Sequence, residues 1–416
     1  MRYICGIILA LLVSHTALAG EEETIRIARI RLIIDNAEYE WQEAGIVPGD
    51  DGETGEAPVL KPETIVSFIS FRPNQRLGIG RLEKRCLDTE RRIRDSGYVY
   101  EAAVTIVPPR KNPGERSIVV EVLSGFLWRY GGGNAWAMIG KTGLGGERAE
   151  ARLYAGYNRS GLRYLHSRVG GIPLALGGQF FYYGPGEYQG KGYGDRENRF
   201  EAVATTGWYI HPGLFTGIDT AQSGFGFSAP GLFSVQPFAV WHGYLNAGVN
   251  SDWGINGRIF WYPLLQESKY EARSYIHIGI NDNFTVALSA GGGYAPGELP
   301  ETALFDLYYT EDRSVRSGYR AAELRGDRYV LGSAELRWNF FSFNFAAVFN
   351  CTLQAYLFAD TGKLDGGIEP RQPLVDAFGG GLRVLFANPV FAYFSFSYGL
   401  NHEGKGRFVC TGTAGF

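Results

Sequence analysis

The chain has 416 residues, a formal net charge of −3, 45% hydrophobic residues and a mean hydropathy of −0.12. Its near-neutral charge gives no electrostatic attraction to nucleic acid, and its polarity excludes a protein built from membrane-spanning helices. The 58 glycines, 25 tyrosines and 27 phenylalanines instead favour a transmembrane β-barrel, in which alternate strand residues face lipid and aromatic residues mark both membrane interfaces. A large secreted β-sandwich or propeller is the alternative.

Residues 1–19 have the pattern of a secretory signal peptide. Arg2 precedes an apolar core from Ile4 to Val13, and Ala17-Leu18-Ala19 forms a cleavage site before Gly20. The mature protein is therefore expected outside the cytoplasm. No apolar run of about 18 residues follows the signal, so no transmembrane helix is predicted.

Residues 20–125 are charged and predict one α+β domain with the order β-α-α-β-β. The first strand is "RIARIRLIID", and Pro62 marks the start of a first helix. A second helix over "GRLEKRCLDTERRIRD" ends before Gly97, and the strands "YEAAVTIVP" and "RSIVVEVL" follow. The acidic, glycine-rich stretch 36–56 reads as an insertion or a mobile loop.

Residues 126–416 alternate between apolar and polar positions, as barrel strands do. After Arg328, one face carries Val330, Gly332, Ala334, Leu336, Trp338 and Phe340, and the other carries Ser333, Glu335, Arg337 and Asn339. The next strand repeats the pattern and places Asp360 on the polar face. About eleven strands precede residue 314 and about five follow it, which predicts an antiparallel barrel of about 16 strands, each about ten residues long.

An arginine-rich stretch, "SVRSGYRAAELRGDRYV", separates these two groups of strands. Alternation alone places Glu335 and Asp360 on the inner wall that follows it, where they are candidate partners for one of its arginines. A guanidinium enclosed with carboxylates gains charge-assisted bidentate hydrogen bonds. The alternative is a solvated surface loop whose arginines bind nothing.

The motifs in this region resemble those of the BamA/TamA-like outer-membrane assembly superfamily. Its sixth extracellular loop carries a Val-Arg-Gly-Phe/Tyr motif, and the two strands that follow carry Gly-x-x-Glu and Phe-x-Asp-x-Gly. The matching loop residues are Val315, Arg316, Gly318 and Tyr319, and the matching strand residues are Gly332, Glu335, Phe358, Asp360 and Gly362. The β-α-α-β-β domain is similar to the family's periplasmic POTRA module, so the resemblance covers nearly the whole mature chain.

The resemblance implies that the loop folds back into the barrel and that its arginine reaches carboxylates on the inner wall. Ser317 separates arginine from glycine here, which departs from the motif; Arg316 is the best equivalent, and Arg313 and Arg320 remain open. The family's C-terminal signal prefers aromatic residues at the last alternate positions, where Phe408 and Phe416 stand.

Signatures of enzymes, metal sites and cofactor sites are weak. The "GKT" of residues 140–142 lacks the upstream glycine of a phosphate-binding loop and is predicted to be a barrel turn. The six histidines have no metal-ligand spacing. Cys351 and Cys410 are predicted to face lipid on strands too far apart for a disulfide. We therefore expect no catalytic activity, cofactor or metal.

The resemblance implies an outer-membrane assembly factor that inserts β-barrel clients, with its POTRA domain in the periplasm. A two-partner-type secretion pore and a passive structural barrel are the alternatives; one POTRA domain is few for the family. The implied partners are outer-membrane lipid, client outer-membrane or secreted proteins and, through the POTRA domain, periplasmic accessory proteins, with no nucleic acid. The domain boundaries are 1–19, 20–125 and 126–416.

Overall fold

The structure is a computed structural model of the full chain. It describes residues 24–49, 59–96, 98–108, 112–124, 128–133, 136–156, 159–183, 199–225, 231–245, 251–300, 303–307, 315–316, 324–345, 349–366, 374–387 and 392–414. The predicted signal peptide lies outside these ranges.

The N-terminal part forms a six-stranded sheet covered by two helices. The strand order is β3-β2-β1-β6-β5, and β4 pairs with one end of β1. The strands are β1 Thr24–Ile34, β2 Ala37–Gln42, β3 Gly45–Pro48, β4 Arg76–Gly78, β5 Val99–Val107 and β6 Glu115–Ser124, and the helices are α2 Pro62–Val66 and α3 Ile79–Asp95.

This sheet and α3 enclose a continuous apolar core. Alternate residues of β1, such as Ile30, Leu32 and Ile34, are fully buried, since one face of the strand meets the helices. On α3, Leu82, Cys86 and Ile93 are buried at spacings of four and seven residues, which place them on one side of a helix. The predicted strand and helix periods in this region are confirmed.

Of the two predictions for residues 36–56, the mobile loop is wrong for the first part, where β2 and β3 form a hairpin inserted beside β1. Asp35 and Asn36 make a two-residue turn with φ of 50° and 72°, values that these residue types tolerate. Between β1 and β2, Glu40 forms an ion pair with Arg29 at 2.5 Å. Acidic composition suggested a loop, but these acids neutralise the arginines of β1.

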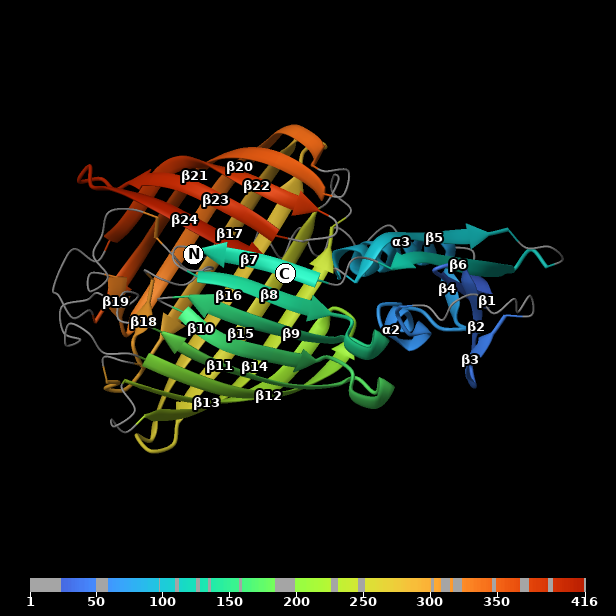
Figure 1. Ribbon diagram of the computed structural model, residues 1–416, viewed down its shortest axis with the longest axis horizontal. Helices are drawn as coiled ribbons and strands as arrows, with labels where there is room; N and C mark the ends of the chain where they lie inside the picture. Colours follow the sequence, from blue (N-terminus) through green and yellow to red (C-terminus); the bar gives the residue numbers. More distant parts are fainter. Residues whose placement is uncertain are drawn as a thin grey trace.

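The rest of the chain forms one antiparallel sheet of 16 strands, closed into the barrel of Figure 1. Its strands are β7 Trp128–Gly133, β8 Trp136–Thr142, β9 Ala149–Gly156, β10 Arg159–His166, β11 Leu174–Tyr183, β12 Arg199–His211, β13 Leu214–Phe225, β14 Leu232–Tyr244, β15 Asp252–Tyr262, β16 Glu267–Gly279, β17 Phe284–Tyr294, β20 Arg328–Phe345, β21 Phe349–Asp365, β22 Leu374–Ala387, β23 Ala392–Leu400 and β24 Gly406–Ala414. The predicted count of eleven strands before the arginine-rich stretch and five after it is confirmed.

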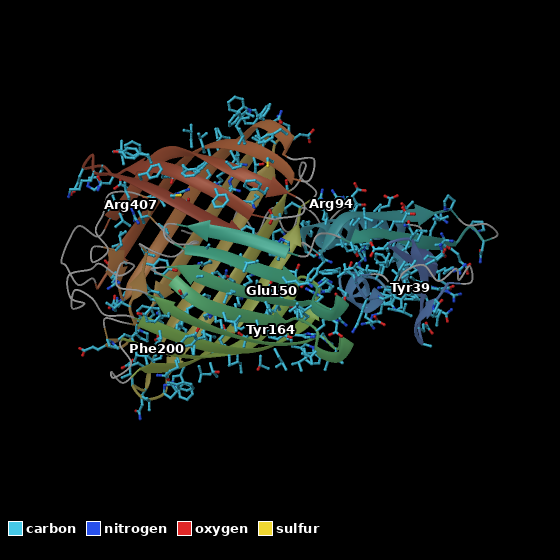
Figure 2. The ribbon with its side chains drawn as sticks, in the orientation of Figure 1. Tyr39, Arg94, Glu150, Tyr164, Phe200 and Arg407 are labelled. Atoms are coloured by element: carbon cyan, nitrogen blue, oxygen red, sulfur yellow. The ribbon has the colours of Figure 1, made fainter. Side chains whose placement is uncertain are left out.

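The predicted alternation separates the two faces of the barrel wall. Trp338 and Leu357 are exposed on the outer face, as is Tyr164 on the strands nearest the viewer in Figure 2, whereas Glu335 and Asp360 are buried on the inner face. Cys351 and Cys410 are free thiols, as predicted, but Cys351 is only 2% exposed. None of the described helices is long and apolar enough to cross a membrane.

One further expectation about this region is wrong. The "GKT" of residues 140–142 is the last part of strand β8, where each residue pairs with β9, and not a turn. The turn begins at Gly143 with the short 3-10 helix η1, Leu144–Gly146. The isolated "GKT" therefore has no phosphate-loop geometry.

The α+β domain contacts one end of the barrel, which we call the domain end; the opposite end is the far end (Figure 1). Lys61 beside α2 forms a 2.5 Å ion pair with Glu147 in the β8–β9 turn. The guanidinium of Arg148 lies over the rings of Phe68 in the domain and Tyr209 in β12, at 4.3 Å and 5.0 Å from their centroids. These contacts join the domain to the barrel rim.

Candidate functional site

Parts of the connection between β17 and β20 lie against the inside of the barrel; the structure describes its residues 295–300, 303–307, 315–316 and 324–327. They include a two-stranded sheet of β18 Phe305–Asp306 and β19 Arg325–Gly326. Val315 and Leu324 are fully buried in one apolar cluster with Phe305, and this cluster includes Tyr356 and Phe358 of the barrel wall. The alternative of a solvated surface loop is therefore wrong.

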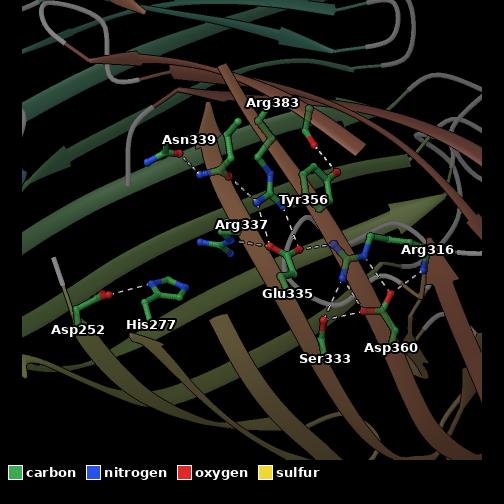
Figure 3. A network of polar contacts seen from close by, with 12 residues as sticks. Asp252, His277, Arg316, Ser333, Glu335, Arg337, Asn339, Tyr356, Asp360 and Arg383 are labelled. Carbon is green, nitrogen blue, oxygen red and sulfur yellow. Dashed lines mark hydrogen bonds and ion pairs between the residues drawn. The ribbon is translucent and has the colours of Figure 1, made fainter. Parts of the chain in front are cut away.

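Arg316, near the middle of this connection, binds Glu335 and Asp360, the two acidic residues that alternation had placed on the inner wall (Figure 3). Its Nε and Nη2 donate to the two oxygens of Asp360 at 3.0 and 2.6 Å, and its backbone N–H donates to the same carboxylate at 3.2 Å. Nη1 forms an ion pair with Glu335, and Nη2 donates to Ser333 Oγ at 3.0 Å. This bidentate geometry is the strongest form of arginine–carboxylate pairing.

The ring of Phe358 supports the guanidinium from one side. The central carbon of the Arg316 guanidinium lies 3.8 Å from the ring centroid, close enough for a cation–π contact. Phe358 is two residues before Asp360 in β21, so both side chains point into the barrel. The Phe-x-Asp spacing thus supplies a stacking surface and a counter-charge from one strand.

The two carboxylates depend on Arg316 to different extents. Glu335 also binds Arg383 at 2.9 and 3.0 Å and Arg337 at 2.7 Å, so it keeps two cations from the wall without Arg316. Asp360, 3% exposed, has Arg316 as its single cationic partner within the described residues, with Ser333 Oγ donating at 2.6 Å. A buried carboxylate without a cation is costly. Arg316 is therefore the main compensation for the charge of Asp360.

The structure brings only some of the predicted residues to Arg316. Gly362 is on the inner face, where a Cβ would overlap the backbone of β20 at Val330, so this position needs glycine. We call Arg316 and its partners Ser333, Glu335, Phe358 and Asp360 the anchor. Gly332 shares the outer face with exposed Val330 and Leu336 and is not part of it. Phe408 is 64% exposed on the outer face. Gly318, Tyr319 and Phe416, and the alternative arginines Arg313 and Arg320, lie outside the described residues.

Sequence reasoning missed a second polar cluster on the inner wall near the domain end. Asp252 of β15 accepts a hydrogen bond from His277 Nδ1 of β16 at 2.8 Å (Figure 3). From the strand on the other side, His242 Nε2 of β14 also donates to Asp252, at 3.3 Å. Alternation places all three inward, but the pairing depends on strand register, which the sequence does not give. Within the described part of the chain, no set of three or more His, Cys, Asp or Glu side chains has a geometry suited to a metal ion.

No protein-family model and no curated protein matches the chain. Among solved structures, it is similar to CdiB from Escherichia coli (TM-score 0.56, 13% identity, 93% of this chain and 76% of that chain) and to CdiB from Acinetobacter baumannii (0.54, 14%, 93% and 74%). BamA from Haemophilus ducreyi lacking POTRA domains 1–3 aligns with a TM-score of 0.47 at 13% identity over 94% of this chain and 85% of that one. The two CdiB matches show that this chain shares their fold.

Proposed function

We propose that this protein is an outer-membrane assembly factor of the BamA/TamA-like superfamily that helps β-barrel clients fold and insert. In this proposal the barrel lies in the bacterial outer membrane, and residues 20–125 form one periplasmic POTRA domain. The order β1, α2, α3, β5, β6 supports the POTRA assignment, since it is the predicted β-α-α-β-β core once the hairpin β2–β3 and the short strand β4 are set aside.

The observation that carries this proposal is the seam between the first and last barrel strands. β7 and β24 are the two ends of the 16-strand order and lie side by side in Figure 1, yet among the described residues no backbone hydrogen-bond ladder joins them. β7 also ends in three glycines, Gly131 to Gly133, which weaken a strand. Unpaired strand edges accept a further strand by β-augmentation.

The wall three to four strands from β24 is built differently and gives the seam a frame. β20 and β21 have 18 and 17 residues, against 6 and 9 for β7 and β24. Arg316 ties the inserted loop to both long strands, through Glu335 on β20 and Asp360 on β21. In the proposed mechanism a client strand pairs with the open edge of the seam while this anchored wall keeps its register.

The experiment that tests the function is depletion of the protein in its native cells, followed by quantification of folded outer-membrane barrels. The proposal predicts that folded forms of many barrel clients fall together, because they share the insertion step. If one exported protein alone is lost, the protein is a secretion pore and not an insertion factor. If no protein changes and the purified barrel conducts ions without clients, it is a passive barrel.

The alternative is a two-partner-type secretion pore for one exported protein, and the fold shared with the two CdiB chains is compatible with it. Export through the lumen requires the loop anchored by Arg316 to leave it, because Val315 and its cluster occupy the inside of the barrel. Client-dependent exposure of this loop would favour the secretion pore over the insertion factor.

A further inference from the structure

Four residues on the inner wall form a straight row across four neighbouring strands. Glu335 of β20 pairs directly with Phe358 of β21, Phe358 with Gly379 of β22, and Gly379 with Gly399 of β23. Side chains of directly paired residues point to the same face of a sheet. In this row, Glu335 and Phe358 are therefore followed by two glycines, which have no side chain.

The space above these two glycines is filled by Phe358 and by the main chain of Arg316. A Cβ on Gly399 would overlap the backbone carbonyl oxygen of Arg316 and lie 2.9 Å from Cζ of Phe358. A Cβ on Gly379 would also lie 2.9 Å from the same ring carbon. Real Cβ atoms essentially never approach heavy atoms this closely, so alanine at either position requires a shift of the wall or of the loop.

The two glycines thus determine where two parts of the anchor rest. The Phe358 ring leans over Gly379 and Gly399, and it carries the guanidinium of Arg316 at 3.8 Å from its centroid. The main chain of the loop at Arg316 rests directly on Gly399. At Gly379 the atom nearest to a Cβ is the backbone oxygen of Tyr398 on β23, at 2.1 Å, so packing of the neighbouring strand also demands glycine there, whereas at Gly399 the nearest atom belongs to the loop. Another inner-wall glycine has room: at Gly291 the nearest atom to a Cβ is Cγ of the flexible Arg273 side chain, at 3.3 Å.

We infer that Gly379 and Gly399 form a glycine seat, a pair of positioning residues that sets the depth at which Phe358 and Arg316 lie in the barrel. They act through the ring and the loop backbone and touch neither carboxylate. A shift of the loop lengthens the hydrogen bonds from Arg316 to Asp360. An increase of well under 1 Å in the donor–acceptor distance is enough to weaken them. This inference goes beyond the proposed function, because it concerns how the loop is held and its test needs no client.

The test measures how often the loop leaves its seat. Val315, beside Arg316, is fully buried, so a cysteine placed there in the full-length protein reacts with a maleimide only when the loop opens. Labelling at position 315 is followed in liposomes by peptide mass spectrometry. We expect Gly399→Ala to raise the labelling rate of Val315→Cys about tenfold or more. The matched inner-wall change Gly291→Ala should leave this rate unchanged, and a Gly399→Ala rate equal to that of the parent would overturn the inference.

The Arg316→Ala background separates a seat from general damage to β23. Once the anchor is lost, the loop is free to move off Gly399, so Gly399→Ala should add no further increase in labelling. An equal, additive increase in both backgrounds would contradict a positioning role. If Gly399→Ala alone prevents folding, Arg316→Ala should restore the yield of folded barrel; failure in both backgrounds would also overturn the inference.

Discussion

At the scale of single residues, the anchor depends on an unequal distribution of charge. Three guanidiniums, those of Arg316, Arg337 and Arg383, surround Glu335, whereas Asp360 relies on Arg316. Glu335 and its two wall arginines therefore remain a compensated group if the loop leaves. Asp360 does not, because its remaining partner among the described residues is the Ser333 hydroxyl. Departure of the loop therefore breaks one ion pair, Arg316 with Asp360, that no other described cation replaces.

We predict that Arg316→Ala lowers the thermal unfolding midpoint of the purified barrel, with a cost of about 3–5 kcal/mol, because it leaves Asp360 buried without a cation. In double-mutant cycles, the coupling of Arg316 to Asp360→Asn should exceed its coupling to Glu335→Gln. Arg328→Ala is the control, since the Arg328 side chain is 55% exposed at the far end. Equal couplings to both acids would show that the asymmetry is absent.

Alternation predicted the inward positions of Glu335 and Asp360, because strand period is a local property of sequence. It did not predict Arg383 as a partner of Glu335, nor Gly399 beneath the loop, because both depend on strands that are distant in the chain. The Asp252 cluster was missed for the same reason. Local periodicity therefore identifies which residues face the lumen, and register decides which of them meet.

At the scale of elements, the α+β domain has a core of its own that shares no buried residue with the barrel cluster. The two parts meet through Lys61, Arg148 and Arg91, whose Nη1 donates to the carbonyl of Leu245 at 3.3 Å. These contacts are polar or cation–π contacts. The domain should therefore be stable alone and only weakly held on the barrel rim.

We predict that a fragment of residues 21–125 folds as a soluble α+β domain, visible by circular dichroism. Burial raises the pKa of the Cys86 thiol to about 12, so at pH 8 it should react with thiol reagents only on unfolding. The reaction rate across a urea series then reports the stability of the fragment. Rapid labelling of Cys86 without denaturant would contradict an independent core.

Docking of the domain should weaken in acid. The hydrogen bond from Lys61 lowers the pKa of Glu147 below its ordinary value of 4.5, so this contact contributes fully above that value and is lost as pH falls through the lowered pKa. Lys61 is 52% exposed, so the contact contributes at most about 1 kcal/mol. Spin-label distances between domain and barrel should broaden at low pH, and Glu147→Gln should show the broad distribution already at pH 7. A distribution independent of both pH and Glu147→Gln would remove this contact from the docking surface.

At the scale of the whole molecule, a rigid wall and an unpaired seam stand on different strands of one barrel. The strands β20, β21 and β22 are long, β20 and β21 carry the residues that bind Arg316, and β7 and β24 are short and without a ladder between them among the described residues. The sequence predicted the number of strands and their division around the loop, because alternation and turns are local signals. It could not predict the state of the seam, since first and last strands meet only after closure.

The most direct test of the proposed function is to lock the seam covalently. With Cys410 of β24 replaced by serine, Gly132→Cys on β7 is combined with single cysteines along β24, and the pair that oxidises is used in cells. The register partners Gly132→Cys and Ala137→Cys, within the β7–β8 ladder, form the control disulfide. We predict that the oxidised seam lowers folded outer-membrane barrels generally and that a reductant restores them, while the control disulfide has no effect. Normal levels of folded clients with a fully locked seam would contradict the account.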